Sequence, residues 1–543
     1  MVNMITFGVI TFIFLAATVY LGWYGYKSTR DNSEFLLGRN KASPVIIALS
    51  YGATFVSASA IVGFGGMAAK YGLSMIWLAV LCIVIGTLIA FIVFGKRMRR
   101  IGKELGAFTF SDFLGKRFKS QGIRTASALI VIIGMPIYCA AVLLGGVNFV
   151  TATIGIDKDV ALLGLSLIVA LYVTYGGVIA VMYNDALQAS IMLVGMIIIS
   201  AFTFYELGGI ADANTALGAL WNAKIASGDK VMEVLATNGM TGWTSFPEFG
   251  SNVWMTVVTT LLMGVGIGAL AQPQLAVRFM SAKDENTLNR SLGIGAVFIL
   301  VILGSAFTIG PLSNVFFAEQ HGGLSAIEYV SNIDMIIPTF VNELFANVTF
   351  GDVFVSIFIL AILCASISTM SALLHTMGAS MGYDLWSRIK SKKETVGSGI
   401  AKSMRSSRIS TLVMMVVVII VAYCMPSNII AKATTIFMGL TAATLLSAYA
   451  HGLFSKKPNV VAAKCSIVVG AAAWILWAFF VEYGTSKLGL CNIIFGVDSL
   501  ASGTLGYIDP LVIALPLSAI TLAVVCLIRP IEDTTISTVV EQI

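Results

Sequence analysis

The sequence predicts an all-α polytopic membrane protein with thirteen transmembrane helices. Of its 543 residues, 58% are hydrophobic and only 11% are charged, whereas soluble domains are about 25% charged. Interruptions at matching places in two predicted helices indicate a core of two five-helix units in inverted repeat. About 20 apolar residues span a bilayer. The predicted spans are 4–25, 44–69, 73–95, 124–148, 160–182, 184–206, 253–277, 291–317, 353–382, 409–425, 428–453, 460–482 and 509–528.

The chain is predicted to be one integral membrane domain, residues 1–543, without a soluble module. Spans 2–6 (about 44–206) and 7–11 (about 253–453) form the two repeats, and spans 4–25, 460–482 and 509–528 are peripheral. The first stretch resembles a signal peptide in length, but it has no basic leading region, and Lys27 and Arg30 follow it. We therefore predict that it remains as a span.

Basic residues predict the orientation, because cytoplasmic loops are enriched in lysine and arginine. With the N-terminus outside, the C-terminus inside and alternating spans, all but six of the 33 basic residues are cytoplasmic. The six are Lys70, Lys158, Lys224, Lys230, Lys432 and Lys487. The net charge of +6 follows from this bias and needs no nucleic acid to explain it.

Composition also argues against metal or redox chemistry. The seven cysteines are scattered singly without a C-x-x-C pair, and the three histidines are dispersed. The longest stretch between spans, about 207–252, is predicted outside, either as a solvated connector or as short helices forming a lid. No obligatory protein partner is evident.

Two spans are too polar and too glycine-rich for helices that face only lipid. One is the run from Ala48 to Gly66, and the other runs from Ala365 to Ser380 with seven hydroxyl or imidazole side chains. Backbone groups in hydrocarbon must be paired unless they line a protein cavity. Hydroxyls and freed carbonyls are hard oxygen ligands that suit a small cation. These spans therefore predict a sodium site, and hence a transporter.

The seventh span is interrupted where the second is. It carries Gly264, Gly266, Gly268 and Pro273. Gly-x-Gly patterns also occur in ordinary close helix packing, but the pairing with span 2 favours a binding site near mid-membrane.

Ser368 and Thr369 lie on one face of the ninth span at helical pitch, where both hydroxyls can point into a cavity. The alternative is that each hydroxyl bonds the carbonyl one turn back in its own helix. We favour the ligand interpretation because the pair lies opposite a broken helix.

Three other polar residues have two interpretations each. Asp185, at the turn between spans 5 and 6, is either a membrane carboxylate with a partner or role, or a solvated turn residue. His375 is a hydrogen-bonded core residue or, less plausibly, a proton relay. Lys70 snorkels to the outer surface or attracts an anionic solute.

Five stretches of the sequence resemble motifs of the sodium:solute symporter family and occur in the same order along the chain. This family has the leucine-transporter fold. The stretches are Glu34 to Arg39, Ala53 to Ala58, Thr109 to Phe118, Tyr175 to Asp185 and Gln272 to Phe279. The resemblance covers most of the chain, from span 1 to about span 11. It implies a symporter rather than an enzyme. The lack of long loops and of glycosylation-dense regions suits a prokaryotic inner membrane.

The resemblance implies a sodium site. Its ligands would be the carbonyls of Ala53, Val56 and Ala365 and the hydroxyls of Ser368 and Thr369. Relatives with a second cation site use an aspartate and serines, which match Asp185, Ser368 and Ser371 here. The next matching position is Ala372, which puts a complete second site in doubt.

The substrate is expected between the two broken helices, near Ser57, Ala60, Gly63, Gly266 and Gly268. This pocket lacks the amide and charged side chains of sugar-transporting relatives, so a small carboxylate-bearing solute is expected. Helix N-termini would offer N–H groups to the carboxylate. The motifs most resemble sodium/pantothenate symporters, and the Gln272-Pro273 region also resembles sodium/proline symporters.

We therefore predict sodium-coupled import of pantothenate, proline or a short monocarboxylate by alternating access. Proton coupling through Asp185 or His375, and a substrate sensor on the same helices, are the alternatives. A channel is disfavoured because only a few spans are polar.

Overall fold

The computed structural model describes residues 4–29, 32–38, 42–346, 348–386, 399–483 and 490–529. These residues form helices and connecting segments, without a strand among them. A single bridge joins Ala42 to Ala282. Eleven helices in the described ranges are long and apolar enough to cross a membrane. The predicted class, an all-helical membrane protein, is therefore confirmed.

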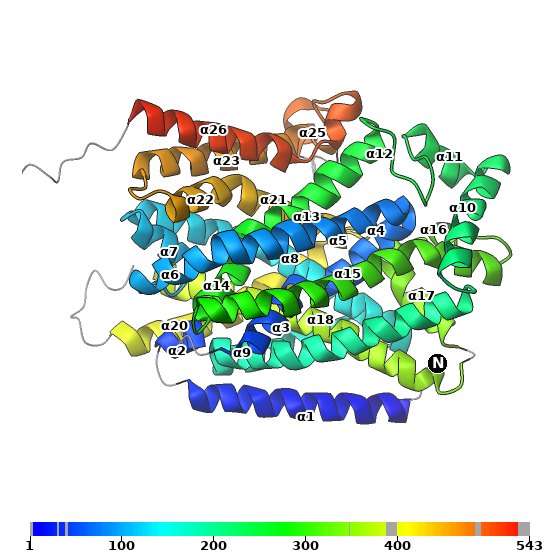
Figure 1. Cartoon of the computed structure of the whole chain (residues 1–543), viewed down its shortest axis with the longest axis horizontal. Coiled ribbons are helices and arrows are strands. Elements are labelled where there is room, and N and C mark those ends of the chain that lie inside the picture. The colour runs from blue at the N-terminus through cyan, green and yellow to red at the C-terminus, as the bar shows by residue number, and fades with distance from the viewer. Residues whose placement is uncertain are drawn as a thin grey trace, which may run out of the picture.

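The long helices lie roughly along one direction in the molecule (Figure 1). They are α1 (Met4–Ser28), α8 (Gln121–Ile154), α9 (Lys158–Glu206), α15 (Glu285–Gln320), α18 (Gly351–Ala379), α20 (Gly399–Cys424), α23 (Val460–Phe480) and α26 (Pro510–Ile528). Further crossing helices are built from consecutive segments. These are α3 (Pro44–Phe55), η2 (Ser59–Gly63) and α4 (Phe64–Tyr71); η3 (Gly72–Met75), α5 (Ile76–Ile83), η4 (Val84–Gly95) and α6 (Lys96–Glu104); α12 (Asn252–Met255), η5 (Thr256–Met263), α13 (Gly264–Gly266), η6 (Gly268–Ala271) and α14 (Pro273–Ser281); and α21 (Ile430–Thr441), η9 (Ala442–Leu446) and α22 (Ser447–Phe454).

Shorter helices connect these elements at the two ends of the bundle. They are α2 (Asn32–Leu37), α7 (Phe110–Arg117), α10 (Ile210–Ala226), α11 (Lys230–Thr237), α16 (Ala326–Tyr329), η7 (Ile333–Met335), α17 (Ile336–Leu344), α25 (Leu490–Phe495) and η10 (Gly503–Tyr507). The π-helix η8 (Ser380–Trp386) extends α18. The predicted connector 207–252 thus contains two helices, α10 and α11.

The thirteen predicted spans fall on eleven long helices because two of those helices each contain parts of two spans. α9 changes direction at Gly177, whose φ of 60° and ψ of −162° are not helical. Its halves correspond to the predicted spans 160–182 and 184–206. Likewise, the helical run from Ser59 to Glu104 changes direction at Gly72, whose φ of 71° and ψ of −162° are not helical, and it contains the end of the second predicted span and the third. The number of crossings and their orientation stay predictions.

Burial separates the centre of the bundle from its edges. In α18 and its extension, 83% of the most apolar window is buried, against 11% in α1 and 17% in α26. α1 and α26 lie along opposite edges of the bundle (Figure 1). A side chain that faces lipid gains nothing from being covered by protein, so the two outermost helices remain apolar and exposed. The polar residues of α18 therefore lie in the protein interior.

Candidate functional site

The first broken helix is interrupted between Phe55 and Ser59. Val56 has an extended conformation (φ −89°, ψ 103°), and its N–H closes the last turn of α3 by bonding the carbonyl of Gly52. Ser57 then starts the next segment, because its side-chain oxygen accepts a hydrogen bond from the N–H of Ala60 at 3.3 Å. A serine hydroxyl at a helix start replaces the missing intrahelical acceptor. The break leaves carbonyl groups of α3 without partners in their own helix.

The second broken helix is interrupted at Gln272, whose ψ of 115° is extended. Pro273 follows as the first residue of α14, a position where its missing N–H costs nothing. The Gln272 amide closes the gap by donating to the carbonyl of Gly268 at 3.0 Å and to the Thr441 hydroxyl at 2.7 Å. The structure thus has breaks in both segments where the sequence predicts interruptions.

The hydroxyls of Ser368 and Thr369 reach from α18 to the broken end of α3. Both donate to the carbonyl oxygen of Ala53, at 2.9 Å and 3.2 Å respectively. Thr369 also lies 3.4 Å from the carbonyl oxygen of Thr54. The two hydroxyls therefore bridge two helices, instead of each bonding only to its own helix as in the alternative interpretation.

Of the remaining predicted ligands, Ala365 contacts these hydroxyls, and Val56 lies close to Ala53 in the chain. The carbonyl of Ala365 accepts a hydrogen bond from Ser368 at 3.3 Å. Val56 is the C-terminal cap of α3, three residues after Ala53, and both residues are fully buried. The structure therefore brings Ala53, Ala365, Ser368 and Thr369 into one hydrogen-bonded cluster of oxygen atoms. Such a cluster suits a small hard cation, because the hydroxyl hydrogens can rotate away and leave the oxygen lone pairs free.

Asp185 is a buried carboxylate with partners from two other helices. Its Oδ2 accepts hydrogen bonds from Ser50 at 2.7 Å and from the Arg278 guanidinium at 2.8 Å. Arg278 also donates to Thr54 at 3.2 Å, and Thr54 follows Ala53 in the chain. Asp185 is fully buried and Arg278 almost so. This arrangement matches the interpretation of Asp185 as a membrane carboxylate with a partner.

Three further predicted residues have definite positions. The hydroxyl of the buried Ser371 donates to the carbonyl of Ser368 at 2.8 Å. The imidazole of His375 lies 2.9 Å from the carbonyl oxygen of Phe35, the geometry of a hydrogen-bonded core residue. The Lys70 ammonium lies 5.3 Å from the ring centre of Tyr71 at the end of α4. Neither His375 nor Lys70 belongs to the cluster around Ala53.

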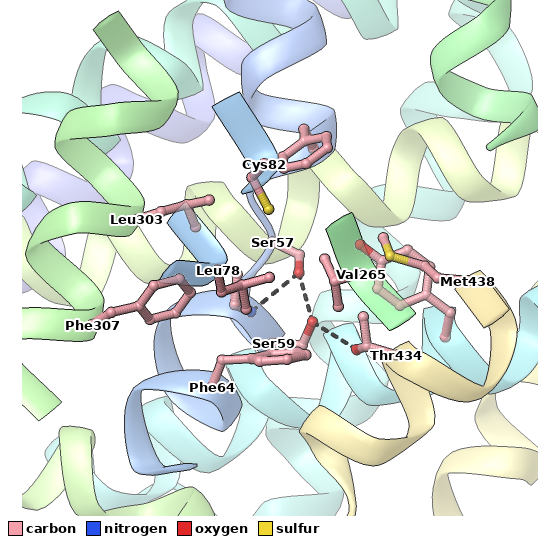
Figure 2. A pocket seen from close by; sticks show the side chains of 13 residues that line it. Ser57, Ser59, Phe64, Leu78, Cys82, Val265, Leu303, Phe307, Thr434 and Met438 are labelled. Atoms are coloured by element: carbon pink, nitrogen blue, oxygen red, sulfur yellow. Dashed lines mark hydrogen bonds between the residues drawn. The ribbon is translucent and has the colours of Figure 1, made fainter. Parts of the chain in front are cut away.

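A small cavity of about 20 Å³ lies beside the break of the first helix, between α5, α8, α13, α15 and α21. Ser57 and Ala60, both predicted to contact the substrate, line it. Figure 2 shows Ser57 and Ser59 near its centre, with Thr434 reaching toward them from α21. Ser59 and Thr434 also line the cavity but were not among the predicted substrate-binding residues. Their signals in the sequence are the polar run of the second span, which contains Ser59, and the threonine pair of the eleventh span, which begins at Thr434.

The three glycines predicted at the substrate site do not line this cavity. A Cβ atom at Gly63 would lie 2.7 Å from Ile430, one at Gly266 would lie 3.0 Å from Leu81, and one at Gly268 would lie 2.7 Å from Met438. Their visible role is therefore close helix packing, the alternative that Gly-x-Gly patterns leave open. Contact of these glycines with the solute stays a prediction.

Two broken helices that meet beside a buried cluster of oxygen atoms define a class of membrane protein, the secondary transporters with discontinuous helices. The model of the sodium:solute symporter family matches residues 35–470, and the chain belongs to this family. Its members are transporters, and the protein is accordingly an integral membrane protein.

Characterised bacterial proteins are similar along most of their length. The osmoregulated proline transporter OpuE of Bacillus subtilis is 26% identical over 495 residues, covering 89% of this chain and 90% of that protein. The sodium/pantothenate symporter of Haemophilus influenzae is 28% identical over 470 residues, covering 86% and 88%. The sodium/proline symporter of Escherichia coli is 24% identical over 493 residues, covering 89% of each chain.

Among solved structures, a sodium-coupled sialic acid symporter in a substrate-bound, outward-open state aligns with a TM-score of 0.71. The sequences are 17% identical, and the alignment covers 97% of this chain and 98% of that one. This likeness shows a shared fold. The family and its relatives indicate solute symport with sodium as the coupling ion.

Proposed function

We propose that the protein imports a small carboxylate-bearing solute by sodium-coupled symport with alternating access. The observation that carries this proposal is the contact of Ser368 and Thr369 with the Ala53 carbonyl at the broken end of α3. A sodium ion held by Ala53, Val56, Ala365, Ser368 and Thr369 would tie the broken helix to α18. The adjoining cavity at Ser57 and Ala60 would then be set for the solute.

Asp185 and Ser371 are proposed to act in coupling or as ligands of a second cation. Both are linked by hydrogen bonds to the proposed sodium site or to the residue beside it. Arg278 bridges Asp185 and Thr54, and Ser371 bonds the Ser368 carbonyl. Movement of either helix at the sodium site would therefore disturb the Asp185–Arg278 pair. We also propose thirteen crossings with the N-terminus outside, in a prokaryotic cytoplasmic membrane.

The sodium gradient and the membrane voltage together supply enough free energy to accumulate the solute. A tenfold sodium gradient supplies roughly 1.4 kcal/mol, and 100 mV adds about 2.3 kcal/mol per elementary charge. One sodium ion can therefore hold a neutral or zwitterionic solute at several hundredfold accumulation. A monoanion gains less, because its charge cancels the voltage contribution of the sodium ion.

The direct test is uptake by purified protein in proteoliposomes, with labelled proline, pantothenate and short monocarboxylates as solutes. We expect one of them to accumulate when sodium is higher outside, and not when potassium replaces sodium. Accumulation that follows an imposed proton gradient and ignores sodium would overturn the proposal in favour of proton coupling. The absence of accumulation for every solute, with binding retained, would instead favour a sensor.

A further inference from the structure

The connection between α23 and α26 exposes a group of large apolar side chains. Its described part, residues 490–509, contains α25 and η10. Six side chains in this stretch are at least 45% exposed, and we call them the α25 patch: Ile493, Ile494, Phe495, Val497, Leu500 and Leu505. Exposed apolar patches of this kind mark contact with another protein or with a membrane.

The patch is held in place by the end of α23. The N–H of Leu500 donates to the carbonyl of Phe480 at 2.8 Å, and the Ser499 hydroxyl donates to the carbonyl of Val481 at 2.7 Å. The ring centres of Phe480 and Phe495 lie 5.8 Å apart. Backbone groups next to hydrocarbon must be paired within the protein, and these bonds provide part of that pairing. The connection is therefore a folded structure that can lie against lipid.

The polar groups of this stretch are few and paired with one another. Asp498 is the only charged residue from Leu490 to Ile508. Its carboxylate accepts a hydrogen bond from the Asn492 amide at 3.1 Å. A polar edge beside an apolar patch is typical of segments that lie at the boundary between lipid headgroups and acyl chains.

The position of α25 in the bundle favours lipid over water. In Figure 1, α25 lies on the same edge of the bundle as α23 and α26, beside α12, whereas α10 and α11 extend farther along the bundle. α26 is apolar enough to cross a membrane, and it exposes Leu517, Ile520 and Val524. The α25 patch therefore continues an apolar surface that faces lipid.

We propose that the α25 patch lies at the interface of the bilayer and contacts the acyl chains of lipids. A second copy of the chain is the competing occupant. Helices that associate within membranes pack closely through small residues, whereas the six side chains of the patch are branched or aromatic. Acyl chains are fluid, so they cover protruding side chains without a matching groove.

The proposed lipid contact is connected to the core of the bundle by two polar contacts. The Lys432 ammonium of α21 lies 2.8 Å from the carboxylate of Glu482, just after α23. The N–H of Asp509 donates to the Thr259 hydroxyl of η5 at 3.0 Å. Thr259 belongs to the second broken helix, and α21 lines the cavity. A patch fixed at the interface therefore anchors the neighbouring ends of both elements at a constant depth in the membrane.

The test replaces Phe495 by the photoreactive residue p-benzoylphenylalanine in the full-length protein, reconstituted into phosphatidylcholine vesicles. Irradiation attaches this residue to C–H groups in contact with it, and mass spectrometry identifies phosphatidylcholine bound to the labelled peptide. Ile493 is replaced in a second variant, so that the test remains if one variant does not fold. Ile520, exposed on α26, is the reference for lipid contact. Lys230, the exposed first residue of α11, is the reference for a position away from lipid.

We expect the lipid adduct at positions 493 and 495 to form within about twofold of the yield at position 520, and roughly tenfold above the yield at position 230. Yields as low as that at position 230 would show that the patch lies in water and would overturn the proposal. A cross-linked product of twice the chain mass, in place of the lipid adduct, would assign the patch to a second copy and overturn it as well.

Discussion

Ser368 and Thr369 supply the two side-chain oxygens of the proposed sodium site. Each hydroxyl contacts the Ala53 carbonyl, so each substitution by alanine removes one oxygen from the proposed ligand set. We expect Ser368→Ala and Thr369→Ala each to raise the sodium concentration for half-maximal uptake at least tenfold, about 1.4 kcal/mol of sodium binding. A sodium titration of uptake measures this change.

Ser366→Ala is the control for this titration. Its hydroxyl is equally buried on α18 but donates to the Val142 carbonyl at 2.9 Å, away from the broken helix. The control should keep the sodium requirement of the unmodified protein. If both site variants also keep it, these residues do not bind the coupling ion.

A second prediction concerns the buried ion pair of Asp185 and Arg278. Removing one partner of a buried ion pair leaves an uncompensated charge and costs roughly 3–5 kcal/mol. Asp185→Asn and Arg278→Gln should therefore each lower the melting temperature strongly, while the double substitution should recover much of the loss. A double variant that is no more stable than Arg278→Gln alone would show that the two groups are not energetically paired.

The segment between α11 and α12 is attached to the C-terminal end of α4, in the first broken helix. The carbonyl of Trp243 accepts a hydrogen bond from Leu73 at 2.7 Å, and its indole donates to the Lys70 carbonyl at 3.2 Å. Gly72 has a φ of +71°, and a Cβ atom there would lie 2.3 Å from the Trp243 carbonyl oxygen. The predicted connector is thus attached to a helix expected to move during transport.

Gly72→Ala should therefore loosen this attachment. We expect cleavage within residues 238–251 by limited proteolysis to accelerate roughly tenfold, because local opening becomes easier by about 1.4 kcal/mol. Gly250→Ala is the control, since Gly250 also has a positive φ of +78° but no neighbour within 4 Å of an added Cβ. Equal cleavage rates in the two variants would mean that backbone strain alone, and not the contact with Trp243, controls this segment.

The helical elements and the two breaks were predictable because their signals are local. Apolar length marks the spans, and the polar run around Ser57 and the proline at position 273 mark the breaks. The Ser368–Thr369 pair was predictable for the same reason. The position of Thr434 in the cavity lining could not be predicted from the sequence, because it depends on how α21 packs against the first broken helix. Arg278 as the partner of Asp185 likewise depends on a contact between residues 93 positions apart.

For the whole molecule, the proposed orientation places the C-terminal end of α6 inside and α11 outside. Lys103→Cys lies in the last turn of α6, and Lys230→Cys is the first residue of α11. In intact cells, a membrane-impermeant maleimide should label Lys230→Cys above the background of the parent protein. It should not label Lys103→Cys until the cells are lysed. Labelling of Lys103→Cys alone in intact cells would reverse the proposed topology.

We propose that sodium binds where α3 and α18 meet and stabilises the transport-competent form. The most direct measurement is the melting temperature of the purified protein across a concentration series of sodium, at constant ionic strength set with potassium. We expect the melting temperature to rise with the logarithm of the sodium concentration once this exceeds the dissociation constant, because binding to the folded state adds about 2.7 kcal/mol of stability at a hundredfold the dissociation constant. We also expect this rise to be lost when Ser368 and Thr369 are both replaced by alanine. Identical melting temperatures in sodium and potassium for the unmodified protein would contradict this proposal.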